Sequence, residues 1–192
     1  MKNYIRHHIN VVIIALRVIL FGAALICIYN LIMAFRFIEE NDPTIINDFL
    51  LNYFTALGKL DSQALQSLGT RYLFDIKWLA IGFMVAYTTL IIYAMSGLVR
   101  LYKCLLKIEK GQMFYNEQSN QLRKVGATVI IFAKLKYLLF CFIGIMSFLD
   151  ISTFFKQLPE FLAFYLLGKF ILIMSYMAEK GEFIQEENEL TI

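Results

Sequence analysis

Four basic side chains stand inside long apolar runs of this sequence: Arg17, Lys134, Lys136 and Lys169; the candidate intramembrane cation site consists of Arg17, Lys134 and Lys169. A cation at the centre of a bilayer costs about 2.5–3.5 kcal/mol on insertion scales, so it needs water, a headgroup or an acid nearby. The same runs contain no aspartate or glutamate that could pair with these cations, or with Lys136, which lies about 200° around a helix from Lys134. Two interpretations stay open. The side chains snorkel to an interface along their flexible stems, or Lys134 and Lys169 line a polar cavity for an anion, an anionic lipid headgroup or a partner's carboxylate.

The residues that enzymes use for catalysis are few in this chain. His7 and His8 are the only histidines, so neither a histidine-based triad nor a histidine metal cluster can be assembled. Cys27, Cys104 and Cys141 show no CxxC spacing, and we interpret them as free thiols that pack as small apolar groups. The sequence therefore indicates a non-enzymatic protein with neither a metal site nor a cofactor.

The elements that must position these residues follow from hydropathy. Apolar residues make up 59% of the 192 residues, charged residues make up 17%, and the mean hydropathy is +0.64. A helix needs about 20 apolar residues to cross the hydrocarbon core, and four continuous runs approach or exceed that length: residues 11–35, 78–99, 125–149 and 161–177. The sequence predicts an all-α polytopic membrane protein with four transmembrane helices in a single membrane domain, residues 1–192.

The basic residues beside the runs predict the orientation of the chain. One set of flanks holds Lys2, Arg6, Arg100, Lys103, Lys107, Lys110, Arg123, Lys124 and Lys180, and the other holds fewer basic residues: Arg36, Lys59, Arg71, Lys77 and Lys156. Because cytoplasmic flanks carry the excess of lysine and arginine, we expect both termini, the inner loop 100–124 and the tail 178–192 in the cytoplasm. The outer loop 36–77 and a short turn, 150–160, then lie outside. The net charge of +3 is too small to indicate direct binding of nucleic acid.

The outer loop contains one patterned segment. Between residues 44 and 57 the apolar side chains recur at helical spacing, which predicts an amphipathic helix in this extracytoplasmic loop. Such a helix lies on the outer bilayer surface or caps the bundle. Since Asp48 is its main charge and it has no cationic face, capping is favoured.

The cytoplasmic side carries opposed charges. The second span is expected to continue as a helix to near Gly111, with Lys103, Lys107 and Lys110 on one face. The tail is acidic, with Glu182, Glu186, Glu187 and Glu189. The tail either docks on the basic loop through a network of charge pairs or stays solvated, because single exposed pairs are each worth well under about 1 kcal/mol.

Two short motifs resemble a known family. Gly111 to Phe114, followed by Leu122 to Gly126, resembles the motif between the second and third helices of a bacterial membrane family, domain of unknown function 2975, and residues 185–192 are similar to its acidic tail. Gln118 stands where that family usually has asparagine. The resemblance implies a four-helix protein of the bacterial cytoplasmic (inner) membrane, without an established activity, linked to a cytoplasmic helix-turn-helix regulator. Its motifs supply these candidate partner-binding residues: Gly111, Phe114, Leu122, Arg123 and Gly126, together with Lys103, Lys107, Lys110, Glu186, Glu187 and Glu189.

Three functions remain open at this point. The first is a non-enzymatic membrane-linked regulator that binds a partner protein through its inner loop and tail. The second is an accessory subunit of a larger membrane complex, held by Lys134 or Lys169 against a carboxylate of its partner. The third is a small transporter or immunity-type protein that binds an anionic or lipid ligand. The lipid bilayer is a partner in all three, and homo-oligomerisation stays open.

Overall fold

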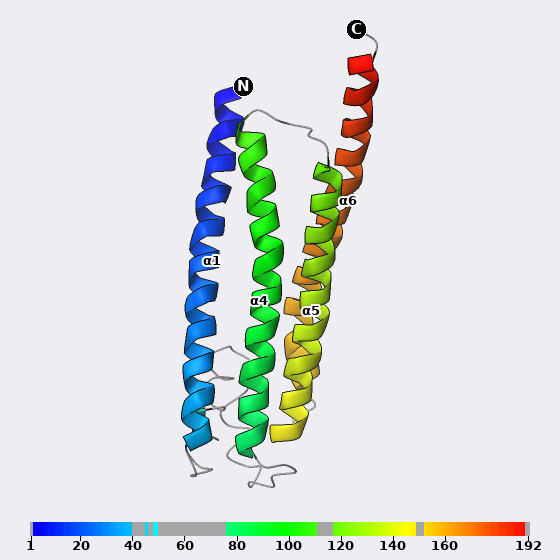
Figure 1. Ribbon diagram of the computed structural model, residues 1–192. Helices are drawn as coiled ribbons and strands as arrows, with labels where there is room; N and C mark the ends of the chain where they lie inside the picture. Colours follow the sequence, from blue (N-terminus) through cyan, green and yellow to red (C-terminus); the bar gives the residue numbers. More distant parts are fainter. Residues whose placement is uncertain are drawn as a thin grey trace. The chain divides into compact units, whose positions relative to one another are not determined.

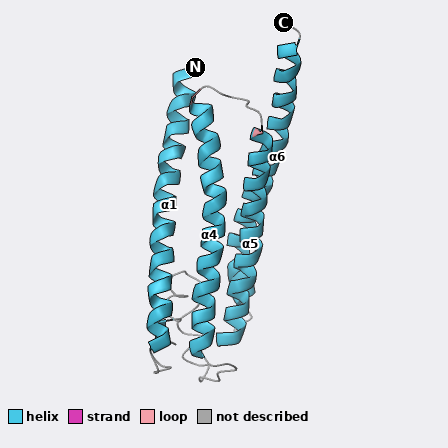
Figure 2. Cartoon of the chain, viewed as in Figure 1, coloured by secondary structure: helices cyan, strands magenta, loops and turns pink. Residues whose placement is uncertain are grey.

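The computed structural model describes residues 2–39, 45, 48–49, 76–110, 117–148 and 152–190, and helix is the only regular structure in them (Figure 2). Four long helices carry the chain: α1 (Lys2–Glu39), α4 (Ile76–Glu109), α5 (Gln118–Phe148) and α6 (Ser152–Leu190) (Figure 1). Each holds a segment long and apolar enough to cross a membrane. The all-α class and the four candidate membrane-spanning helices are therefore confirmed.

The helices extend beyond the apolar runs that predicted them. The second span continues to Glu109, as expected. The short turn expected over residues 150–160 is wrong from Ser152 onward, because α6 already begins there and continues through Pro159. Residues 178–190, expected as a tail, also belong to α6. Hydropathy marks the part of a helix that sits in lipid, whereas the helical backbone continues for as long as its hydrogen bonds are satisfied.

The amphipathic helix expected over residues 44–57 lies largely outside the described residues. Ile45, Asp48 and Phe49 are described, and each is helical. The half-buried Phe49 ring packs edge-on against Phe37 of α1, with 5.0 Å between ring centroids. The amphipathic helix as a whole stays a prediction.

The chain forms two compact units, each built from parts of all four long helices. Unit 1 comprises Met1–Leu25, Ile92–Phe132 and Ala163–Ile192, and unit 2 comprises Ile26–Ile91 and Ala133–Leu162. The core of unit 2 joins α1, α4 and α5, and its buried members are Ala34, Phe37, Ala80, Phe83, Met84, Phe140 and Ile143. The Phe83 and Phe140 rings pack edge-to-face in this core, perpendicular to each other and with 5.4 Å between their centroids.

Unit 1 is held by close approaches at glycines. A Cβ added to Gly168 on α6 would lie 2.6 Å from Cγ1 of Ile130 on α5, and one added to Gly126 would lie 3.0 Å from the Gly168 carbonyl oxygen. A Cβ on Gly97 of α4 would lie 2.8 Å from Thr128. Small residues that let helix backbones approach closely are typical of packing in membranes, where dispersion contacts replace the hydrophobic effect.

The outer faces of the helices are apolar. Phe21, Phe35 and Leu166 are 68%, 70% and 63% exposed, and many other large apolar side chains face outward in the same way. Soluble proteins rarely expose apolar surface on this scale. Lipid, which needs no hydrogen bonds from these side chains, is the solvent that suits such faces.

Candidate functional site

Arg17 has a partner that the sequence did not indicate. Its Nε and Nη2 donate hydrogen bonds of 3.0 and 2.7 Å to the Tyr102 hydroxyl, within unit 1. The guanidinium carbon also lies 5.5 Å from the centroid of the same ring. Tyr102 follows the second predicted span by only a few residues, so a search for hydroxyls at span ends could have found it.

Lys134 and Lys169 are both exposed, Lys134 in unit 2 and Lys169 in unit 1. The Lys169 ammonium lies 5.6 Å from the centroid of the Tyr165 ring, one turn earlier on α6, which is cation–π distance. Their exposure leaves each ammonium open to a group that approaches from outside its own unit.

Lys136 corrects the expectation that no acid is available within the helices. Its ammonium forms an ion pair with the Glu160 carboxylate of α6, and the two side chains are 13% and 36% exposed. The pair exists because α6 begins at Ser152, which places Glu160 two turns inside a helix instead of in a turn. The Lys136 ammonium also lies 5.8 Å from the Phe140 ring centroid, so the cation is held from two sides.

Unit 2 contains further polar side chains within its apolar helices. Tyr87 of α4 stacks on Phe83. Asn30 of α1 is 0% exposed and Thr88 of α4 is 4% exposed. The sequence did not single out Asn30 or Thr88, although an asparagine amide in an apolar run is the kind of signal that indicates a specific role in a membrane.

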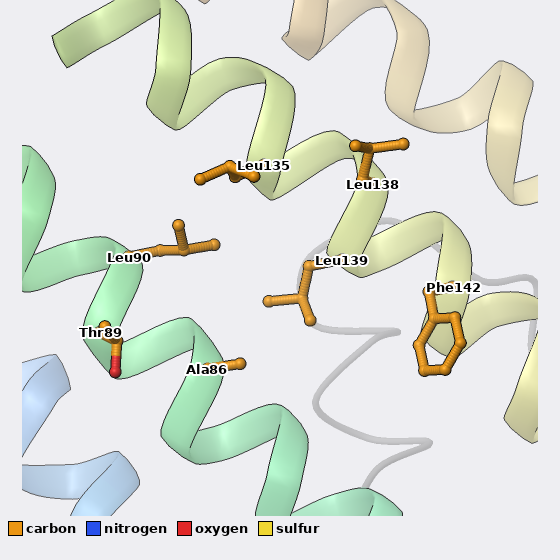
Figure 3. Close-up of a pocket in the computed structure, with 7 residues that line it drawn as sticks. All are labelled: Ala86, Thr89, Leu90, Leu135, Leu138, Leu139 and Phe142. Carbon is orange, nitrogen blue, oxygen red and sulfur yellow. The ribbon is translucent and has the colours of Figure 1, made fainter.

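An apolar groove lies between α4 and α5 of unit 2, with a volume of about 480 Å³. Figure 3 shows Ala86 and Leu90 directed toward α5, where Leu139 points back at them. The other lining residues are Thr89, Leu135, Leu138 and Phe142. The Thr89 hydroxyl donates to the Val85 carbonyl at 2.9 Å, so the groove presents mainly apolar surface.

The predicted partner-binding residues fall mainly in unit 1. The cations of this group are exposed: Lys103, Lys107, Lys110 and Arg123. Lys124, which follows Arg123, is also exposed. Leu122 is half-buried and Gly126 is buried at the contact with Gly168, so Gly126 packs helices together. Glu187 is exposed, Glu186 and Glu189 lie in α6, and the side chains of these last two, with Gly111 and Phe114, lie outside the described residues.

One contact joins the end of α6 to the start of α5. The backbone N–H and the hydroxyl of Ser119 donate to the two carboxylate oxygens of Glu182, at 2.8 and 2.9 Å. The first N–H groups of a helix have no partner within it, and a carboxylate there also interacts favourably with the helix dipole. Glu182, one of the acidic residues of the predicted tail, therefore contacts the N-terminus of a helix, and docking of the residues after it on the basic loop stays a prediction.

Metal and thiol chemistry add little to this inventory. Among the described residues no group of three or more histidine, cysteine, aspartate or glutamate side chains is placed to hold a metal ion. Cys27, Cys104 and Cys141 are free and buried, as predicted.

Comparison with protein families, with curated proteins and with solved structures finds no match to this chain. The resemblance to domain of unknown function 2975 therefore stays a prediction that rests on its motifs.

Proposed function

We propose that this chain is a non-enzymatic multi-pass protein of the bacterial cytoplasmic membrane that binds a soluble partner protein at the cytoplasmic face of unit 1. The observation that supports it most is the contact of Glu182 with Ser119. It attaches the polar end of α6 to the start of α5, which gives the chain an ordered, charged surface next to its apolar segments. A transmembrane anchor alone needs no such surface.

The binding surface is cationic. It consists of Lys103, Lys107 and Lys110 after the apolar part of α4, and of Arg123 and Lys124 near the start of α5, all of them exposed. We call these five residues the cationic surface. A partner with an acidic face fits it, and the helix-turn-helix regulator implied by the resemblance is the candidate. Binding of this kind weakens with salt, because charges at an interface rim act mainly on the association rate.

The experiment is affinity purification from membranes with charge reversal at the cationic surface. The variant carries Arg123→Glu and Lys124→Glu, and the matched control is Lys156→Glu, an exposed cation of unit 2. We expect the double variant to lose a soluble partner that both the control and the unaltered chain retain, with the loss reproduced by high salt. Recovery of the same soluble proteins with all three chains would contradict the proposal.

The orientation is tested separately by cysteine labelling. With the native cysteines replaced by serine, a single cysteine at Lys110 is expected to resist a membrane-impermeant maleimide in intact cells and to react after permeabilisation. Labelling at Lys110 from outside would reverse the proposed orientation and remove the cytoplasmic partner.

A second candidate function is an accessory subunit of a larger membrane complex. The exposed Lys134 supports it, because a cation on the outer face of an apolar helix is stabilised by a carboxylate on a neighbouring transmembrane helix. Purification in mild detergent tests it: a co-purifying membrane protein that Lys134→Leu releases is expected, and a monomer without companions counts against it. The transporter or immunity-type function stays a further hypothesis: it requires a polar cavity at Lys169, which lies exposed beside Tyr165.

A further inference from the structure

Asn30 and Thr88 are buried polar side chains of unit 2 without a hydrogen-bond partner among the described residues. Neither amide atom of Asn30, Nδ2 or Oδ1, is hydrogen-bonded to any described residue, and the same holds for the Thr88 hydroxyl. Both residues lie in helices that are apolar enough to span a membrane. In hydrocarbon no bulk solvent compensates such groups, and buried polar atoms in native proteins are nearly always paired with protein or ordered water.

The register of the helices brings Asn30 and Thr88 to the same level of unit 2. Helices α1 and α4 run in opposite directions (Figure 1), and Ala34 of α1 belongs to the same core cluster as Phe83 and Met84 of α4. One turn before Ala34 on α1 is Asn30, and one turn after Met84 on α4 is Thr88. Because the helices are antiparallel, both steps lead the same way along the unit. The two unpartnered groups therefore come from facing helices at one level.

The chemistry of the two groups selects their ligand. The asparagine amide donates through Nδ2 and accepts through Oδ1, and the threonine hydroxyl does both. A metal cation would satisfy only the oxygens and would face the Nδ2 hydrogens, whereas an anion would satisfy only the donors. The ion pair of the same unit, Lys136 with Glu160, is already neutral as a pair. The ligand must be neutral, must donate as well as accept, and must be small.

We propose that Asn30 and Thr88 bind a water molecule that bridges α1 and α4 within the membrane-spanning part of unit 2. Water is the smallest molecule with the required donors and acceptors, and buried waters typically make two to four hydrogen bonds to protein groups. The bridge matters for the position of α1, since only 17% of the most apolar 18-residue segment of this helix is buried. Apolar contacts alone allow a helix to slide, whereas a hydrogen-bonded bridge holds α1 at one register against α4.

The test combines stability with a direct measurement of water. Asn30→Leu, Thr88→Val and the double variant are compared in lipid nanodiscs by thermal unfolding, followed with a dye that reacts with the buried native thiols. Thr89→Val is the matched control, because Thr89 is exposed and its hydroxyl already bonds to the Val85 carbonyl of its own helix. In parallel, solid-state NMR of protein with ¹⁵N-labelled asparagine measures transfer of magnetisation from water to the Asn30 amide, identified as the signal that Asn30→Leu removes.

The proposal makes definite predictions for both measurements. Each single variant has a lower melting temperature than the unaltered protein. The melting temperature of the double variant is no lower than that of the less stable single variant, and Thr89→Val leaves the melting temperature unchanged. The Asn30 amide receives magnetisation from water, and Thr88→Val reduces that transfer. A rise in melting temperature with Asn30→Leu alone would show that the amide was simply unpaired. Non-additive changes of melting temperature at the two sites, without transfer of magnetisation from water to the Asn30 amide, would show a direct hydrogen bond between the two side chains. Either result overturns the proposal. If Asn30→Leu does not fold, the more conservative Asn30→Gln identifies the Asn30 signal, and the NMR measurement on Thr88→Val decides.

Discussion

Replacing Glu160 by methionine should destabilise the protein by about 2 kcal/mol, because it leaves the Lys136 ammonium largely buried without its anion. Removing one partner of a fully buried ion pair costs about 3–5 kcal/mol. Lys136 is only 13% exposed, whereas Glu160 is 36% exposed, so water already screens part of the interaction. That exposure reduces the expected cost below the range for fully buried pairs.

The converse substitution should be milder. Lys136→Met leaves a carboxylate that water reaches, and we expect a loss of about 1 kcal/mol. The double variant Lys136→Met with Glu160→Met replaces the ion pair by two apolar side chains of similar volume, a change that is often neutral or stabilising in buried sites. The double variant should therefore be more stable than Glu160→Met, with a stability close to that of the unaltered protein.

Thermal or denaturant unfolding in mild detergent measures these differences, and the chain supplies its own probe. Cys27, Cys104 and Cys141 are all buried, so a thiol-reactive dye reports their exposure as the helices separate. Lys156→Met, a change at an exposed cation of the same unit, is the control. If the two single changes simply add in the double variant, within about 0.5 kcal/mol, the two side chains are not coupled and the reasoning fails.

Three further predictions test the packing of unit 1. Gly168→Ala should lower the free energy of unfolding by about 1–3 kcal/mol, because the added Cβ would lie 2.6 Å from a neighbouring side chain. Gly22→Ala is the control, since its Cβ meets nothing within 4 Å and the change should be neutral or slightly stabilising. Equal melting temperatures of the two variants would refute this prediction. Glu182→Ala should lose about 1 kcal/mol and speed amide hydrogen exchange at the start of α5, and unchanged exchange there would mean that the contact is not formed. Tyr102→Phe should cost about 1 kcal/mol while Arg17 is present and nothing in an Arg17→Leu background, as a double-mutant cycle would measure.

The two proposals also separate cleanly in experiment. The cationic surface belongs to unit 1, and the Asn30 and Thr88 site belongs to unit 2. A chain that binds no soluble partner could still hold water between α1 and α4, and the reverse is equally true. Failure of one proposal therefore leaves the other standing.

Much of the fold follows from local composition. Each span was predicted from one continuous apolar run, and α1, α4, α5 and α6 each contain one. This works because a backbone in hydrocarbon must satisfy its own hydrogen bonds, so an apolar run of sufficient length has the helix as its solution. Burial of the three cysteines was predictable for a related reason, since a thiol without metal or disulfide spacing packs as a small apolar group.

The ends of the helices were harder to predict than their centres. The sequence placed a turn where α6 has already begun, and a tail where α6 continues. Polar segments such as these carry no hydropathy signal, and whether they are helical depends on capping and on contacts with other helices. The contact of Glu182 with Ser119 is one such contact.

The partners of the charged and polar side chains were decided only by tertiary structure. The sequence by itself showed that Arg17 and Lys136 stood in apolar surroundings and needed compensation. It could not show that Tyr102, 85 residues away, and Glu160, 24 residues away, provide it. Hydropathy is summed along the chain, whereas a hydrogen bond or an ion pair requires two groups within about 3–4 Å. That distance is set by how helices pack and in which register, and no single helix contains the information.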